Sequence, residues 1–169
     1  MGYNVMKKII VIGCPGSGKS TFSRALQSKT NIPLYYLDMM YWNADKTIVE
    51  KSIFRTRLAE TLDMEEWIID GNYASTMEKR IIACDTVFFL DYPTEVCISG
   101  IKERRGKKRE DMPWIETEED IEITEYIKGF NEEQRPHILE LLEKYRDKNI
   151  VVFKSREDAD KFLIQLKSR

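Results

Sequence analysis

One short segment, IVIGCPGSGKSTF (Ile10–Phe22), constrains the fold of this chain more than any other. The β-branched run before Gly13 predicts a strand, and residues 20–28 have the spacing of a helix. Between them, two further glycines, Gly16 and Gly18, allow successive backbone N–H groups to turn inward around an anion. The helix contributes the partly positive charge of its N-terminus. The segment therefore predicts a strand–loop–helix unit that binds phosphate.

The spacing within this segment narrows the range of possible ligands. A glycine, four residues, Gly18, Lys19 and Ser20 form the P-loop pattern, in which the lysine reaches the β and γ phosphates and the hydroxyl ligates Mg²⁺. We therefore expect ATP and Mg²⁺ as ligands. The residues expected to bind the nucleotide are Gly13, Pro15, Gly16, Ser17, Gly18, Lys19, Ser20 and Thr21.

Short apolar runs alternate with helical patterns along the rest of the chain. Strands are predicted at residues 8–12, 33–37, 67–70, 86–90 and 150–153. Helices are predicted at residues 20–28, 48–64, 75–83, 94–105, 118–130, 131–146 and 156–167. Because the strands are apolar throughout, the pattern predicts an α/β fold with a parallel sheet covered by helices on both faces.

Length and composition fit one domain over residues 1–169. The formal net charge of −2 argues against direct nucleic-acid binding. The three cysteines, Cys14, Cys84 and Cys97, lack metal-type spacing and suit a reducing compartment. The apolar run before Cys14 is too short for a signal-peptide core or a membrane span, so we expect a cytoplasmic protein without a membrane partner.

Carboxylates follow three of the predicted strands. In parallel sheets, ligands bind beyond the carboxyl ends of the strands, where we expect Asp38, Asp70 and Asp91. Asp38 or Asp70 would assist Ser20 in holding Mg²⁺ through water. For Asp91 the alternative is a cap on the helix predicted at residue 94.

A basic stretch, KERRGKKRED (Lys102–Asp111), has three interpretations. It is a solvated helix end, a nucleic-acid patch, or a lid whose arginines (Arg104, Arg105 and Arg109) neutralise a transferring phosphoryl group. The acidic residues at 116–125 favour the lid, which we expect at about 104–116.

Residues 39–66 are expected to form a helical substrate-binding segment. Trp42 would stack on a nucleobase or belong to the core. Arg55 would hold an acceptor phosphate or, with Arg57, form surface ion pairs. The only histidine, His137, is given no catalytic part.

Several strings together resemble a known family. They are IVIGCPGSGKST, LYYLDMMYW, WIIDGNY, VFFLDYP, RGKKREDMPW and NEEQRPHILELL. They are similar to those of the topology modulation proteins, a FlaR-like branch of the P-loop kinases related to adenylate and shikimate kinases. The resemblance runs from about Lys8 to Leu163. It implies a three-layer, adenylate-kinase-like core with strand order 2-3-1-4-5 and a flexible lid.

The resemblance also implies roles for single residues. Arg104 matches a phosphate-binding arginine, and Asp38 matches a carboxylate near the acceptor hydroxyl. Asp70 and Gly71 resemble the Asp-Gly pair of adenylate kinases, but residues 72–74 replace the Phe-Pro-Arg that follows it there. That departure removes a substrate-contacting arginine and argues against AMP as the acceptor. No zinc is expected, because the lid has no four-cysteine cluster.

The residues together predict a Mg²⁺-dependent kinase that transfers the ATP γ-phosphoryl group to a small acceptor, a nucleotide or nucleoside. Lys19 would bind the transferring group, Asp38 would orient an acceptor hydroxyl, and the lid arginines, joined by Arg135, would close over the site. Two alternatives stay open: a nucleotide-gated regulator of DNA topology with little turnover, and a metabolite kinase of the shikimate or gluconate type. Both a monomer and a homodimer are compatible with the sequence.

Overall fold

A computed structural model describes residues 6–169, so the first five residues of the predicted domain lie outside the described part. The described residues contain one five-stranded sheet, which is parallel throughout and has the strand order β2-β3-β1-β4-β5. The strands are β1 (Lys8–Gly13), β2 (Leu34–Tyr36), β3 (Trp67–Asp70), β4 (Thr86–Leu90) and β5 (Asn149–Phe153). This confirms the predicted α/β class and strand order.

The centre of the sheet is the centre of the hydrophobic core. Ile10 of β1 pairs with Ile69 of β3 on one side and with Val87 of β4 on the other, and all three side chains are fully buried. Burial on both faces explains why these strands are apolar at every position rather than at alternate ones.

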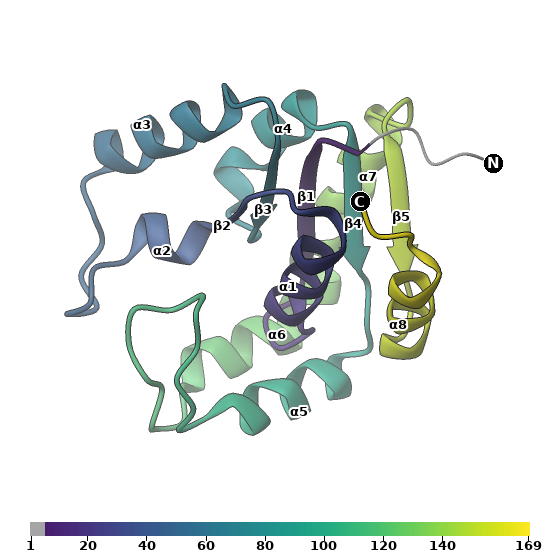
Figure 1. Ribbon diagram of the computed structural model, residues 1–169. Coiled ribbons are helices and arrows are strands. Elements are labelled where there is room, and N and C mark those ends of the chain that lie inside the picture. Colours follow the sequence, from purple (N-terminus) through teal and green to yellow (C-terminus); the bar gives the residue numbers. More distant parts are fainter. Residues whose placement is uncertain (1–5) are drawn as a thin grey trace.

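Helices cover both faces of the sheet (Figure 1). They are α1 (Lys19–Thr30), α2 (Leu37–Tyr41), α3 (Lys51–Leu62), α4 (Ala74–Ala83), α5 (Thr94–Arg104), α6 (Ile121–Glu133), α7 (Arg135–Lys144) and α8 (Arg156–Gln165). In the view of Figure 1, α1 and α8 lie in front of the sheet, and α4 and α7 lie behind it. Helices α5 and α6 lie beyond the carboxyl ends of β1 and β4, and α2 and α3 extend from the β2 edge.

Several boundaries differ from the sequence-based expectation, and two of the differences have a clear physical reason. The strand predicted to reach Leu37 stops at Tyr36, because its partner β3 ends at Asp70, and the chain then forms the short helix α2. The helices predicted at 118–130 and 131–146 instead meet at Gln134, since Pro136 in the first turn of α7 has no N–H to continue α6.

The segment between α5 and α6 has no regular secondary structure. In Figure 1 it extends from α5 toward α2, and its Trp114 ring meets the Trp42 ring edge-on with centroids 5.5 Å apart. This segment together with the last residue of α5, residues 104–120, is called the covering loop below. Within residues 6–169, every helix is too short or too polar to cross a bilayer.

Candidate active site

A cavity of about 1160 Å³ lies at the carboxyl edge of the sheet. Its walls come from the loop after β1, the ends of β2 and β3, the covering loop and the start of α8. The structure brings most of the predicted site residues to this one cavity. They are Pro15, Gly16, Ser17, Gly18, Lys19, Ser20, Thr21, Asp38, Trp42, Asp70, Gly71, Arg104 and Arg109.

The glycine-rich loop between β1 and α1 rests directly on α5. Gly16 has φ +84°, and a Cβ atom there would lie 2.0 Å from the carbonyl oxygen of Cys97. From the other side, a Cβ atom at Gly100 would lie 2.0 Å from the carbonyl oxygen of Gly16. Neither position can carry a side chain, so the loop backbone and α5 are in van der Waals contact.

Lys19 is the first residue of α1, and its side chain reaches back to the start of this loop. Its Nζ donates hydrogen bonds to the carbonyl oxygens of Gly13 at 3.0 Å and Cys14 at 3.3 Å. Directly before it, Gly18 caps the start of α1 with φ +94°, and a Cβ atom there would meet nothing within 4 Å. The donors at this point are an ammonium group and the N-terminus of a twelve-residue helix, and there is open space beside them. Together they fit a polyphosphate.

Ser20 and Asp70 form the polar floor of the cavity. Ser20 Oγ donates a hydrogen bond to Asp70 Oδ2 at 2.7 Å. Burial raises the pKa of Asp70 to about 6, although the charge of Lys19 opposes this shift.

These two residues fit Mg²⁺ only together with a phosphate chain. Among the described residues, no group of three or more His, Cys, Asp and Glu side chains could hold a metal ion alone. Mg²⁺ commonly takes one or two protein oxygens and completes its shell with water and substrate phosphates. Ser20 and Asp70 match that pattern.

Asp38 lies in the first turn of α2, where it accepts a hydrogen bond at Oδ1 from the Tyr73 hydroxyl. Burial raises the pKa of Asp38, and the Tyr73 hydrogen bond opposes the rise. The Tyr73 ring packs against Tyr41 and Phe54, with centroids 4.8 and 5.6 Å away. Asp38 is therefore a carboxylate whose hydrogen-bond partner, Tyr73, is kept in place by packing against other aromatic rings. These rings are called the aromatic wall below.

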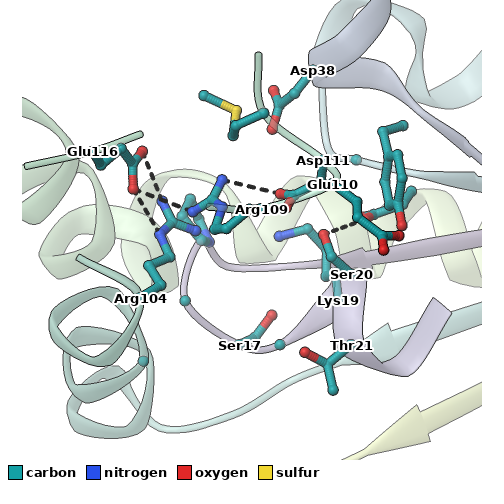
Figure 2. A pocket seen from close by; sticks show the side chains of 18 of the residues that line it. Ser17, Lys19, Ser20, Thr21, Asp38, Arg104, Arg109, Glu110, Asp111 and Glu116 are labelled. Carbon is teal, nitrogen blue, oxygen red and sulfur yellow. Dashed lines mark hydrogen bonds and ion pairs between the residues drawn. The ribbon is translucent and has the colours of Figure 1, made fainter. Parts of the chain in front are cut away.

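Two arginines of the covering loop, Arg104 and Arg109, both bind acidic residues of that loop (Figure 2). Arg104 Nε lies 3.1 Å from Glu116 Oε2, and Arg109 Nη1 lies 3.2 Å from the same oxygen. Arg109 also pairs with Asp111 at 3.0 Å. The carboxylates thus already form ion pairs with the guanidinium groups that would bind a phosphate.

Four predicted residues do not line the cavity. Gly13 ends β1 beneath it, and Arg55 is exposed on α3. Arg105, the C-cap of α5, is half-buried away from it. Arg135 pairs with Asp91 at 2.9 Å instead of joining the other arginines.

Asp91 follows neither of its two predicted roles. It binds Arg135 and Lys154, it does not line the cavity, and α5 has no side-chain cap. These ion pairs lower its pKa, against the effect of burial. Asp91 therefore joins the ends of β4, β5 and α7.

Sequence reasoning missed the parts of the site that depend on tertiary contacts. Asn72, Tyr73, Arg80, Asp111 and Glu116 have no individual role in the sequence-based prediction of the site. The one available signal was the DGNY string itself, in which an amide and a phenol directly follow a strand-end carboxylate.

Solved structures share this fold. The chain is similar to a shikimate kinase from Bacteroides thetaiotaomicron, with 19% identity over 96% of each chain and a TM-score of 0.56. A shikimate kinase from Acinetobacter baumannii in complex with shikimate matches with 17% identity, 94% and 92% coverage and a TM-score of 0.59. A gluconokinase from Sinorhizobium meliloti 1021 matches with 13% identity, 96% and 90% coverage and a TM-score of 0.60.

No protein-family model and no curated protein matches the sequence. The chain therefore has the three-layer P-loop fold that these kinases share.

Proposed function

We propose that this protein is a Mg²⁺-dependent kinase that transfers the γ-phosphoryl group of ATP to a hydroxyl group of a small molecule. The observation that carries the proposal is the convergence of Lys19, Ser20, Asp38 and Arg109 on one cavity. These residues supply a phosphate cradle, a metal ligand, a base and a charge clamp, which are the parts that phosphoryl transfer requires.

The nucleotide half of the site is the loop before α1. Backbone N–H groups of residues 16–20 and the Lys19 ammonium would bind the β and γ phosphates, and Lys19 would exchange its present carbonyl partners for phosphate oxygens. Ser20 and, through water, Asp70 would hold Mg²⁺, which when bound neutralises charge on the β and γ oxygens.

The acceptor half is the wall that carries Asp38. An oxygen of the acceptor attacks the γ phosphorus, the bond between phosphorus and the β–γ bridging oxygen breaks, and ADP leaves. The hydroxyl proton passes to Asp38, which its partner Tyr73 holds in place. Trp42 and Trp114 form an aromatic boundary that would exclude water from this half.

The covering loop supplies the clamp. Arg104 and Arg109 would exchange Glu116 and Asp111 for oxygens of the transferring group. Bidentate guanidinium groups match phosphate geometry and neutralise charge that develops in the transition state. Arg105 and Arg135 are not needed for this arrangement.

The acceptor class remains part of the proposal. The similar structures include kinases named for shikimate and gluconate, which supports a hydroxylated metabolite. The aromatic wall at Trp42 supports a ring-bearing acceptor such as a nucleoside. On the resemblance described above, we also propose that the chain belongs to the topology modulation proteins. The alternative to the kinase function is a nucleotide-gated regulator.

An ATP-consumption screen with nucleosides, nucleoside monophosphates and hydroxy acids tests the proposal. We expect saturable turnover with one acceptor class, and at least a hundredfold loss in Lys19→Met, because the lysine binds the transferring group. Lys29→Met, at the other end of α1, is the matched control and should turn over normally. Absence of turnover with every acceptor, despite tight nucleotide binding, would instead support the regulator.

A further inference from the structure

The turn Asp70–Tyr73 connects three parts of the site that are distant in sequence. The Asp70 carboxylate accepts the hydrogen bond from Ser20 in α1. The Asn72 side-chain amide accepts from the Gly13 N–H at 3.0 Å and donates to the Gly13 carbonyl oxygen at 2.5 Å. The Tyr73 hydroxyl donates to Asp38 in α2. One short turn therefore bridges the phosphate loop and the acceptor wall.

The link to the phosphate loop shares an atom with Lys19. The carbonyl oxygen of Gly13 accepts from both Asn72 Nδ2 and Lys19 Nζ. When Lys19 turns to a phosphate, Asn72 remains as the partner of that carbonyl. Asn72 thus keeps the entry of the loop in place while the lysine is engaged elsewhere.

Arg80 holds this turn from beneath. Its side chain is fully buried in α4 and donates to three consecutive carbonyl oxygens, those of Gly71 at 3.0 Å, Asn72, and Tyr73 at 3.4 Å. Its Nε donates to Thr76 Oγ1 at 3.2 Å. Three of its five N–H groups therefore bind the turn, and a fourth binds Thr76 of its own helix.

The turn needs this support because its conformation is not a local preference. Tyr73 has φ +35°, a left-handed conformation that is uncommon for an aromatic residue. All four of these hydrogen bonds go to carbonyl or hydroxyl oxygens, and although burial lowers the pKa of Arg80 to about 10, the guanidinium remains charged at neutral pH. A buried cation that is satisfied by carbonyl dipoles is costly to keep, and its removal leaves those carbonyls without partners.

We propose that Arg80 is a positioning residue for both halves of the site: through the turn it places Asn72 on the phosphate loop and Tyr73 on Asp38. The catalytic consequence rests on the proposed kinase function, whereas the placement of Asn72 does not. A residue that served stability alone would leave both placements unchanged when it was conservatively replaced.

The conservative variant Arg80→Lys separates these possibilities. Lysine keeps the charge but lacks the planar fork, so it cannot reach three carbonyls and a hydroxyl together. Lys79→Met removes the neighbouring exposed charge on the same helix and is the matched control. Arg80→Met is made in parallel, and each variant is first checked for a cooperative thermal transition.

The first readout is binding of Mg²⁺·ADP by calorimetry. We expect about fivefold weaker binding in Arg80→Lys and in Asn72→Ala, which is the size of one lost neutral hydrogen bond. Because both changes remove the same link, the double variant should bind no more weakly than either single one. Multiplying losses, or unchanged ADP binding in Arg80→Lys with only a lower melting temperature, would overturn the proposal.

The second readout needs no ligand. In the wild type and in Lys79→Met, the Asn72 side-chain amide protons should exchange slowly with solvent in NMR spectra, because Gly13 accepts from Nδ2. In Arg80→Lys they should exchange at least tenfold faster. An amide that stays protected in this variant contradicts the placement even if the protein binds no ADP.

The third readout addresses the acceptor half and uses the best acceptor of the screen. Tyr73→Phe and Arg80→Lys should each lower kcat about tenfold with little change in KM for ATP, and their combination should be no slower than either. Independent losses would overturn this half of the proposal. If the wild type turns over no acceptor, the kinase function fails, whereas the first two readouts still decide the role of Arg80.

Discussion

At the scale of single residues, the site contains a buried carboxylate whose ionisation lowers the stability of the folded state. Asp70 is 5% exposed, and burial raises its pKa to about 6. Between pH 3.8 and about 6 the folded chain retains a proton that the unfolded chain loses near 3.8, and above about 6 the ionised carboxylate lowers the stability of the folded state. The Asp70 contribution therefore makes stability fall as pH rises from about 4 to about 6.

Asp70→Asn removes this penalty and keeps an acceptor for Ser20. We expect the variant to be more stable than the wild type by about 2–3 kcal/mol at pH 7 and by much less at pH 4. Urea unfolding at both pH values measures the difference, with exposed Asp63→Asn as the control. A stability difference that does not depend on pH would show that Asp70 is not the source. The same variant should bind Mg²⁺·ADP more weakly, since a metal-assisting carboxylate is lost.

At the scale of elements, we propose that the covering loop competes with the nucleotide for its own arginines. Glu116 bonds both Arg104 and Arg109 and is only 24% exposed. Because a partly buried pair must be broken before either arginine can bind phosphate, the acidic residues would add an energetic cost to phosphate binding. Of the acidic stretch that favours a lid in the sequence, Glu116 is the residue that pairs with these arginines in the structure.

Glu116→Gln tests this competition. The amide keeps the shape but removes the charge, so we expect Mg²⁺·ATP-analogue binding to become about three- to tenfold tighter, and the thermal stability without ligand to decrease slightly. Calorimetry at two salt concentrations measures the effect, and exposed Glu118→Gln should leave affinity unchanged. Equal affinity in Glu116→Gln and the wild type would mean that these arginines do not bind the nucleotide.

At the scale of the whole molecule, the architecture could be predicted because its signals are local. The apolar strands, the glycine spacing before Lys19 and the helix patterns are each contained in a few consecutive residues, and they gave the sheet and the phosphate loop correctly. The partners of Arg135 and Arg80 could not be predicted in this way. Asp91 and the turn at 71–73 reach these arginines only through the packing of α4 and α7.

Nucleotide binding should also be visible in the stability of the entire chain. Mg²⁺·ADP at about 100 times its Kd should raise the unfolding free energy by about 2.7 kcal/mol, which corresponds to a melting temperature about 5–10 °C higher. A thermal-shift titration measures this change. Lys19→Met should show no shift at the same concentration, and a full shift in that variant would place the nucleotide elsewhere.

The contact between Gly16 and Gly100 restricts how this molecule can open and close. With the two backbones touching, α5 cannot slide or rotate without displacing the phosphate loop. We therefore expect a rearrangement of the region to start beyond the last turn of α5, at Arg105 and Gly106, where Gly106 has φ +76° and an added Cβ atom would meet nothing within 4 Å. We propose this point as the hinge of the covering loop, with α5 keeping its position against the phosphate loop.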